Sequence, residues 1–454
     1  MPLHSDQAIL AATPSSDVPH PGGLLQPVER SPEFISAHQT LSGPALNSEK
    51  QTRLAALNFV CGSRPDAWSI LQSLSLRQWL RLLCWLDYSG LALYFFDQMR
   101  ETRQLGTLPG PITAGLERRL HENTQRTAAM LAESVEIQTQ FQRSGVRYAV
   151  QKGLSLWPNS VPRPELRLQF DLDYLVSPGD LARARGILEH KGYRLYENIG
   201  REWAFKRNEK PGFGFKDLYR DTGSFRVELH ADAPAAAPRL DRIEWRKLRG
   251  FTMPVLAPVD LFLAEGLHAC KHVCAEFVRS AYLVEFRRHA LFRRGDDAFW
   301  RVLERRAAEN ARAPIGLGVT TLLITLVTGE FAPQALTCWM ADRVPPAVRL
   351  WLELYAHRVV LGSYPGSKFH LLLERELGDS CPLPQRTLRE SMIPLCPPRP
   401  VIHASPNEAL TVRARRYWML LEYILLRLRF HLVEGLRFAR ELRRWRRVVH
   451  QIAP

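Results

Sequence analysis

Two aspartates separated by one residue are the part of the sequence best suited to chemistry. Asp171 and Asp173 lie within residues 166–176, whose apolar residues predict a strand. Because side chains alternate along a strand, both carboxylates project from one face, with Cα atoms about 7 Å apart. Carboxylates placed in this way can share divalent cations about 3.5–4 Å apart, the arrangement used for in-line phosphoryl displacement. Burial of this face requires a compensating cation or basic side chain.

A third acid, Glu228, lies in residues 224–230, which also predict a strand. The turn residues Asp221-Thr222-Gly223 precede it and predict a hairpin with residues 213–219. Pairing of this strand with residues 166–176 brings Glu228 close to the two aspartates. An isolated Asp-x-Asp sequence is most often a turn or a solvated pair, so the strand context and the third acid are what favour a site for Mg²⁺ or Mn²⁺.

A turn upstream has the features of a phosphate-binding loop. Residues 146–150 predict a strand, and Lys152-Gly153 follows it directly. Glycine lets backbone N–H groups approach a phosphate closely, and the N-terminus of a following helical turn favours an anion. Lys152 and Ser155 are therefore candidates for contact with the triphosphate of an NTP.

Together these segments resemble the uncharacterised bacterial nucleotidyltransferase family of the polymerase-β-like superfamily. The resemblance is best over residues 125–232, and a weaker similarity continues through the helices that contain His268, His272 and Glu285. The residues that carry it are Val150-Gln-Lys-Gly-Leu-Ser155, Arg167, Asp171-Leu-Asp173-Tyr-Leu-Val176, Gly192-Tyr193 and Val227-Glu-Leu-His230.

For the acids, the resemblance implies that Asp171 and Asp173 are metal ligands and that Glu228 completes the catalytic and metal-binding set. Tyr174 stands where the superfamily usually has a small aliphatic residue, a departure that does not touch the carboxylates. Related enzymes modify RNA, proteins and small molecules, so the resemblance leaves the acceptor open.

For the nucleotide, the resemblance implies a binding loop from Gly153 to Ser155, with Lys152 and Arg167 as further nucleotide-binding residues. The loop has Gly-Leu-Ser where the superfamily usually has Gly-Gly or Gly-Ser. This departure puts the phosphate contact of Ser155 in question.

Four residues, His268, Cys270, His272 and Cys274, have the composition of a zinc site. On a helix the two histidines share one face, and the cysteines lie about 200° around from them, at about 100° per residue. One ion cannot easily reach all four, so we expect the histidines to line a helical wall beside the core. For His230, a packing role and a substrate contact both remain open.

The elements that must position these residues divide the chain into four parts. Residues 1–50 are expected to be a disordered tail, 51–143 a helical region, 144–235 the nucleotidyltransferase-like core and 236–454 a helical C-terminal domain. The expected fold class is α+β, a small mixed sheet flanked by mainly α-helical regions. Because the core alone is small, we expect packing against these flanks to stabilise it.

A basic amphipathic helix is predicted over residues 411–450. Its outer or inner face could contact RNA phosphates, lie on an anionic membrane, or pack on the helical domain, and we expect packing. The apolar residues at helical spacing are Trp418, Leu421, Leu425, Leu428, Leu432, Leu436 and Ala439, and the accompanying arginines include Arg427, Arg437, Arg440, Arg444 and Arg447.

The composition is that of a basic globular protein. The formal net charge of +15 favours anionic partners without specifying one. Seven scattered cysteines and an N-terminus without a secretory signal pattern lead us to expect reduced thiols and a cytoplasmic protein. Residues 313–329 fall short of the roughly 20 apolar residues of a membrane span and predict a buried helix.

The function we expect is Mg²⁺- or Mn²⁺-dependent transfer of a nucleoside monophosphate from an NTP, such as ATP, to a hydroxyl acceptor that is a small molecule, a protein or RNA. One alternative is a glycosyltransferase that uses Asp-x-Asp with a nucleotide sugar, although that chemistry normally needs a longer alternating βα segment before the acids. The other is a nucleotide-binding or scaffold protein that has lost turnover.

Overall fold

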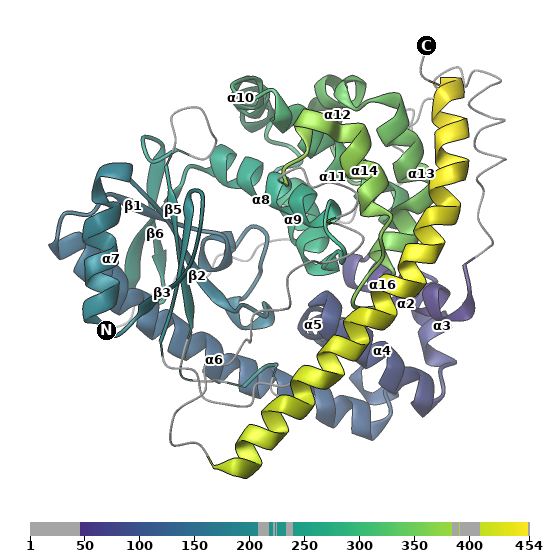
Figure 1. Ribbon diagram of the computed structural model, residues 1–454, viewed down its shortest axis with the longest axis horizontal. Coiled ribbons are helices and arrows are strands. Elements are labelled where there is room, and N and C mark those ends of the chain that lie inside the picture. The colour runs from purple at the N-terminus through teal and green to yellow at the C-terminus, as the bar shows by residue number, and fades with distance from the viewer. Residues whose placement is uncertain are drawn as a thin grey trace, which may run out of the picture.

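The computed structural model describes residues 46–207, 218–220, 223, 225–232, 239–383, 390 and 409–452. Most of the tail expected at 1–50 and most of the strand expected at 213–219 lie outside these residues, as do two of the three predicted hairpin turn residues. Within them the fold is α+β, as predicted: a seven-stranded mixed sheet lies to one side of a mass of helices (Figure 1).

The sheet places the strands that carry the acids at its centre. Its order is β3-β4-β5-β2-β1-β7-β6. β2 runs parallel to β5 and β1 parallel to β7, whereas the other neighbouring pairs are antiparallel. The strands are β1 (Tyr148–Gln151), β2 (Asp171–Val176), β3 (Arg194–Ile199), β4 (Glu202–Lys206), β5 (Arg226–Ala231), β6 (Ile243–Leu248) and β7 (Phe251–Leu256).

The hairpin β6–β7 extends the sheet beyond the predicted core of 144–235, into a segment that we expected to be mostly helical. Its turn uses Arg249 at φ 46° and Gly250 at φ 91°, the left-handed conformations that a tight hairpin requires. β6 alternates exposed and half-buried side chains, so only one face of it packs. The helical C-terminal part therefore begins at Pro258 rather than at residue 236.

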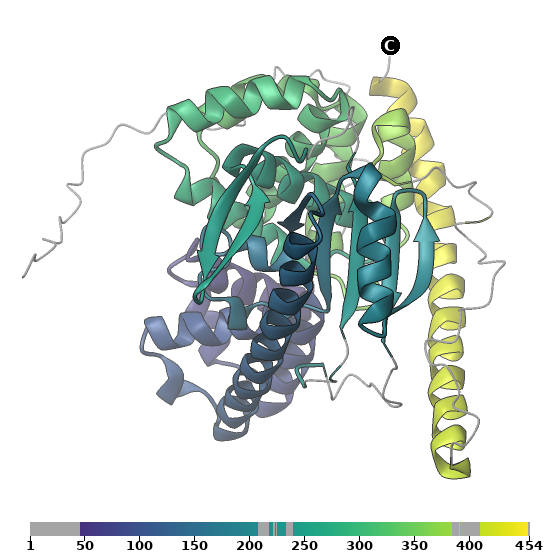
Figure 2. The ribbon, with the colours of Figure 1, turned by 90° about the vertical axis from the view of Figure 1, so that its left-hand side faces the viewer.

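One face of the sheet is covered by α6 (Gly110–Arg143) and α7 (Leu181–His190), which lie across it in Figure 2. Phe141 of α6 makes edge-to-face contacts with Tyr148 and Tyr174 of the sheet. Because alternate side chains point to opposite faces, the apolar half of β2 packs here and its acidic half faces the other way.

The opposite, acid-bearing face meets the C-terminal helices α8 (Pro258–Val273) and α9 (Ser280–Phe292) (Figure 1). Ala149 and Leu175 of the sheet form a small core with Leu261 of α8. On its other side α8 packs closely against the helix that contains Leu317, because a Cβ on Gly266 would lie 2.5 Å from that side chain. The acids therefore lie between the sheet and a firmly packed helical wall.

The remaining helices form the rest of the body. Ser75 and Gln78 make a capping box at the start of α4. α11 is buried, as predicted for residues 313–329, and no helix in the described part of the chain is long and apolar enough to cross a membrane. These helices are α2 (Ser48–Cys61), α3 (Ala67–Gln72), α4 (Leu76–Ser89), α5 (Ala92–Glu101), α10 (Asp297–Ala308), α11 (Arg312–Thr328), α12 (Gln334–Met340), α13 (Pro346–Val360) and α14 (His370–Leu377).

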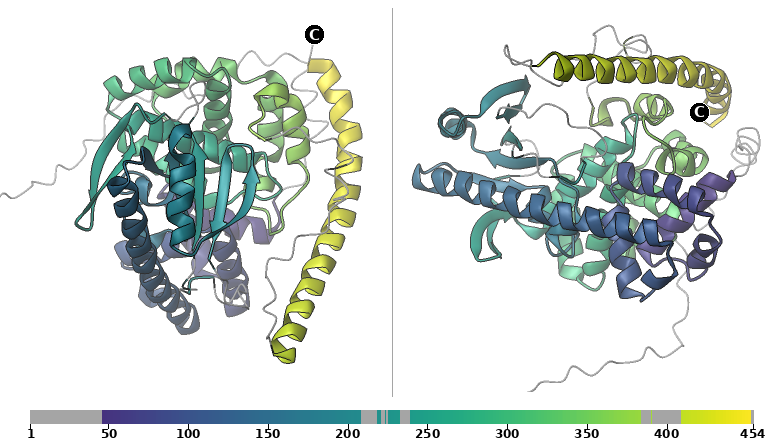
Figure 3. Two further views of the ribbon diagram at one scale, coloured as in Figure 1. Left: turned by 60° about the vertical axis from the view of Figure 1, so that its left-hand side comes forward. Right: turned by 90° about the horizontal axis from the view of Figure 1, so that it is seen from below.

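The predicted C-terminal helix is α16 (Leu410–Ile452), which runs along the outside of the helical body (Figure 3). It packs through Phe430, Phe438, Trp445 and Val448, all of which are buried. The stripe that we expected to pack is instead exposed: every residue from Trp418 to Ala439 named above for it faces outward. Two apolar faces occur on this helix, and the less regular one contacts the body.

Candidate active site

The register of the sheet brings two of the three predicted acids, Asp173 and Glu228, together, whereas Asp171 is not in the group of described residues that could share a metal ion. In the parallel pair β2–β5, Asp173 lies opposite Glu228, Asp171 opposite Arg226, and His230 opposite Leu175. Neighbouring strands lie about 4.7–4.9 Å apart, so directly paired side chains on one face are close together. Two carboxylates in that relation repel each other, so this arrangement requires positive charge nearby.

His230 contacts both carboxylates and supplies part of that charge when its ring is protonated. Its Nε2 lies 3.0 Å from Asp173 Oδ1 and 3.4 Å from Glu228 Oε2. One ligand atom from each of Asp173, Glu228 and His230 lies within 4.8 Å of the other two. Among the described residues, these three form the group that could hold a metal ion. The position of His230, two residues after Glu228 on the same predicted strand, was the sequence signal that could have identified it as part of this group.

Besides Arg226, whose Nε lies 2.8 Å from Glu228 Oε1, Lys152 supplies more of that charge. It follows β1 directly, and its Nζ lies 2.6 Å from Asp173 Oδ1 and 3.8 Å from Glu228 Oε2. Burial by itself lowers the pKa of Lys152, but the charges of Asp173, Asp171 and Glu228 outweigh it and raise that pKa above its ordinary value. The ammonium group is therefore held in its charged form beside the acids.

The two aspartates titrate in opposite directions. Burial, together with repulsion from Asp173 and Glu228, raises the pKa of Asp171 to about 6. Burial acts in the same direction on Asp173, but Lys152 and the hydrogen bond with His230 lower its pKa below the usual range. Burial alone lowers the pKa of His230, but its hydrogen bonds with Asp173 and Glu228 outweigh burial and raise that pKa.

The predicted phosphate loop is a tight, buried turn. Lys152 has φ 53° and Gly153 has φ 35°, and a Cβ on Gly153 would lie 2.0 Å from Gln169 Nε2. That amide donates to the backbone oxygen of Asp171, at 2.6 Å, so the glycine allows Gln169 to brace the acidic strand. Ser155 donates its hydroxyl to Lys152 O and is fully buried. In this structure Ser155 stabilises the turn.

Arg167 lies beside the acids and pairs with α9. Its Nε is 3.1 Å from Glu285 Oε1, and the hydroxyl of Tyr94 in α5 donates to the same oxygen at 2.8 Å. Although burial alone lowers the pKa of Arg167, Glu285 raises it. The residue joins the loop before β2 to the helical wall, and it also lines the pocket that opens beside Lys152.

That pocket lies between Lys152, which contacts the acids, and the helices α8 and α9. His268 and Tyr282 form an aromatic side to it, with ring centroids 4.8 Å apart. Burial lowers the pKa of His268 well below its ordinary value, so a neutral ring faces the site. The lining consists of Lys152, Leu156, Arg167, Leu261, Ala264, Glu265, His268, Tyr282 and Glu285.

The His/Cys group on α8 forms no metal cluster among the described residues. Cys270 and Cys274 are buried in the helical core, whereas His272 packs against Tyr282 with a centroid separation of 4.5 Å. The two histidines thus lie on the wall facing the sheet, and the two cysteines lie behind it.

A buried polar network next to the pocket had no recognisable signal in the sequence. Glu265 Oε2 accepts from Ser160 at 2.9 Å and lies 2.8 Å from His289 Nδ1. The three residues are far apart in the chain, and each alone is typical of a core position. The network ties α8 and α9 to the segment between β1 and β2.

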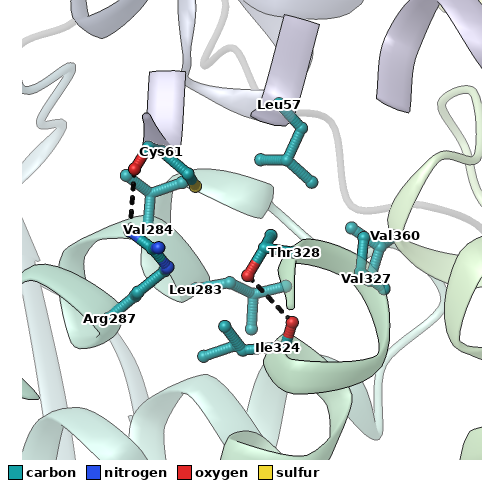
Figure 4. A pocket seen from close by; sticks show the side chains of 9 residues that line it. All are labelled: Leu57, Cys61, Leu283, Val284, Arg287, Ile324, Val327, Thr328 and Val360. Atoms are coloured by element: carbon teal, nitrogen blue, oxygen red, sulfur yellow. Dashed lines mark hydrogen bonds between the residues drawn. The ribbon is translucent and has the colours of Figure 1, made fainter. Parts of the chain in front are cut away.

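A second pocket lies inside the helical body, among α2, α9, α11 and α13 (Figure 4). Its lining is mostly apolar. Arg287 Nη1 donates to Cys61 O at 2.9 Å, and Thr328 donates to Ile324 O at 3.0 Å. Since none of these helices carries the acidic cluster, this pocket is a gap in packing rather than a candidate active site.

Comparison with known proteins identifies a matching protein family. A model described as an uncharacterised nucleotidyltransferase matches residues 75–323, from the start of α4 into α11. The matched region contains the sheet, the acidic cluster and the pocket beside Lys152. No curated protein and no solved structure matches the chain.

Proposed function

Because the match covers more than half of the chain, the protein belongs to the uncharacterised nucleotidyltransferase family, and we propose that it transfers a nucleoside monophosphate from an NTP to a hydroxyl group. The observation that supports this most is the pairing of Asp173 with Glu228 on parallel neighbouring strands, with Asp171 on the same face. This arrangement concentrates negative charge where a cation-bound triphosphate needs ligands.

The residues present fit a divalent cation. Asp173 Oδ2 is buried and accepts no hydrogen bond from the described residues, so its lone pairs are available to a ligand. Carboxylate oxygens are the ligands that Mg²⁺ prefers, and the imidazole of His230 also suits Mn²⁺. Asp173 and Glu228 would hold the ion, with His230 beside them or Asp171 on the same face as a third ligand, and the ion supplies Lewis-acid stabilisation of phosphate charge when bound.

The protein's own groups would divide the remaining work. The acceptor oxygen forms a bond to the α-phosphorus, the bond between this phosphorus and the bridging oxygen breaks, and pyrophosphate leaves. Lys152 would exchange its contact with Asp173 for one with the triphosphate, because an ammonium group can pair with either anion. Glu228 would take the proton that the acceptor hydroxyl loses.

Binding of an NTP analogue with a methylene group between the α- and β-phosphates tests this proposal. We expect the analogue to bind with Mg²⁺ or Mn²⁺, and Glu228→Gln to weaken binding at least about tenfold, because it removes one charge from the set. Glu244→Gln, on the half-buried β6, is the matched control and should leave affinity unchanged. Equal affinities for the wild type and Glu228→Gln, or no binding of any of the four base types, would refute the proposal.

A further inference from the structure

The outward face of α16 carries large apolar side chains in an unbroken stripe. Trp418, Leu428 and Leu432 are 63%, 63% and 66% exposed, and no described residue covers them. Exposed contiguous apolar surface of this kind marks an interaction site, whereas single exposed leucines do not. The stripe consists of Trp418, Leu421, Leu425, Leu428, Leu432 and Leu436.

Rotation of the helix cannot hide this stripe. At about 100° per residue, its centre lies roughly 140° around the axis from Phe438 and Trp445, which are buried against the body. Tyr355 donates to Glu441 at 2.8 Å, and Arg427 Nη1 donates to Glu276 at 2.6 Å, so polar contacts fix the same orientation. The helix lies on the outer edge of the molecule, away from α6 (Figure 3).

The charge around the stripe is strongly positive. α16 contains eleven arginines and three glutamates. Glu441 faces the body and Glu434 pairs with Arg437 at 2.6 Å, so Glu422, which accepts from Trp418 Nε1 at 2.7 Å, is the glutamate of α16 left on the outer face. Beyond Leu436, the side that carries the leucines continues with exposed Arg443 and Arg446.

We propose that the outer face of α16 docks in the plane of an anionic phospholipid surface. The leucines would enter the boundary between headgroups and acyl chains, Trp418 would lie at the interface, and the arginines would contact lipid phosphates, as in amphipathic membrane-surface helices. The helix does not qualify as a membrane span, which agrees with docking in the plane. This inference stands apart from the proposed function, because α16 lies outside the region that the family model matches.

Other partners fit the surface less well. A second copy would bring two arginine-rich helices together, and their repulsion opposes burial of the leucines. A nucleic acid would satisfy the arginines but would leave the leucine stripe in water. Only an anionic lipid surface is complementary to both the apolar stripe and the positive charge.

Sedimentation of the full-length protein with phosphatidylcholine vesicles, with and without phosphatidylglycerol, tests the proposal. We expect binding that requires phosphatidylglycerol and weakens with salt. Leu428→Ser and Leu432→Ser should each reduce binding about tenfold, since each removes an inserted apolar side chain. Leu80→Ser is the matched control, because Leu80 is a half-exposed leucine on α4 of the same body.

Thermal melting of the same variants keeps the result interpretable, since exposed leucines should not change the melting temperature. Binding to neither vesicle, or equal binding by wild type and both stripe variants, would overturn the proposal. So would a dimer that Leu428→Ser dissociates, or RNA binding that persists in both variants when vesicle binding is absent.

Discussion

At the scale of single residues, the repulsion between the acidic side chains of the site is offset by the basic side chains beside them. Asp173 is stabilised by Lys152 and His230, whereas the charge of Asp171 is opposed by burial and by its acidic neighbours. Removing one partner from a buried ion pair leaves an uncompensated charge and is destabilising. The two aspartates of one motif should therefore respond differently to the same substitution.

We predict that Asp171→Asn keeps or raises the melting temperature at neutral pH, because it relieves repulsion, and that Asp173→Asn lowers it by leaving Lys152 without its closest partner. Both variants should lose on the order of 10²-fold or more of transfer activity, since each removes charge needed around the phosphates. Differential scanning calorimetry and transfer assays check this. A destabilised Asp171→Asn with a fully stable Asp173→Asn would contradict the assignment.

The sequence predicted much of this site because strand alternation is a local property. Asp171 and Asp173 share a face for that reason, and the acidic residue of the neighbouring predicted strand was Glu228. The contacts of Lys152 and Arg167 depend on where distant segments fold, so their pairing with Asp173 and Glu285 could not be read from spacing. Whether Ser155 or Gly153 contacts a nucleotide remains a prediction.

At the scale of elements, periodicity identified most strands and helices but not their partners. α16 was predicted within two residues at each end, yet its regular leucine stripe faces outward and the irregular set around Phe438 and Trp445 packs. Periodicity finds an apolar face, and it does not say what covers that face. β6–β7 was missed for a related reason, because β6 exposes its apolar residues Ile243 and Trp245 and half-buries the polar residues between them, the reverse of an ordinary half-buried strand.

The ion pair between Glu276 and Arg427 tethers α16 to the body and should be sensitive to acid. Burial alone raises the pKa of Glu276, but Arg427, with Lys368 and His370, lowers it below its ordinary value of 4.5. Its stabilisation is therefore complete above about pH 4.5 and is lost as the pH falls through the folded-state pKa.

We predict that Glu276→Gln lowers the melting temperature at pH 6 and that its difference from wild type shrinks toward pH 3. Melting curves across this range check the prediction. Glu189→Gln, an exposed partner of Arg185, should show a small difference at every pH. A Glu276→Gln effect that grows on acidification would contradict the role of this pair.

At the scale of the whole molecule, the parts meet at one buried cluster. Tyr94 comes from the N-terminal helices, Arg167 from the segment before β2, and Glu285 from the C-terminal helices, and all three are buried. The cluster lies at the edge of the pocket beside Lys152. The small sheet thus depends on both flanks for its packing and for one wall of the site.

We predict that Glu285→Gln destabilises the protein by about 3–5 kcal/mol, because it leaves the buried guanidinium of Arg167 without a counter-charge. The double variant Arg167→Met with Glu285→Gln should recover part of this loss, since both charges are then absent. Urea denaturation measures the free energies of unfolding. A double variant less stable than the sum of the two single changes would show that charge pairing is not the cause.

The central claim is that the acids around Asp173 support transfer of a nucleoside monophosphate. The most direct test supplies the protein with Mg²⁺, a cell extract as the source of acceptor, and NTPs labelled on either the α- or the γ-phosphate. We expect label to reach an acceptor from the α-position only, and Asp173→Asn to abolish this transfer. Transfer of label from the γ-position, or equal transfer by wild type and Asp173→Asn, would contradict this claim.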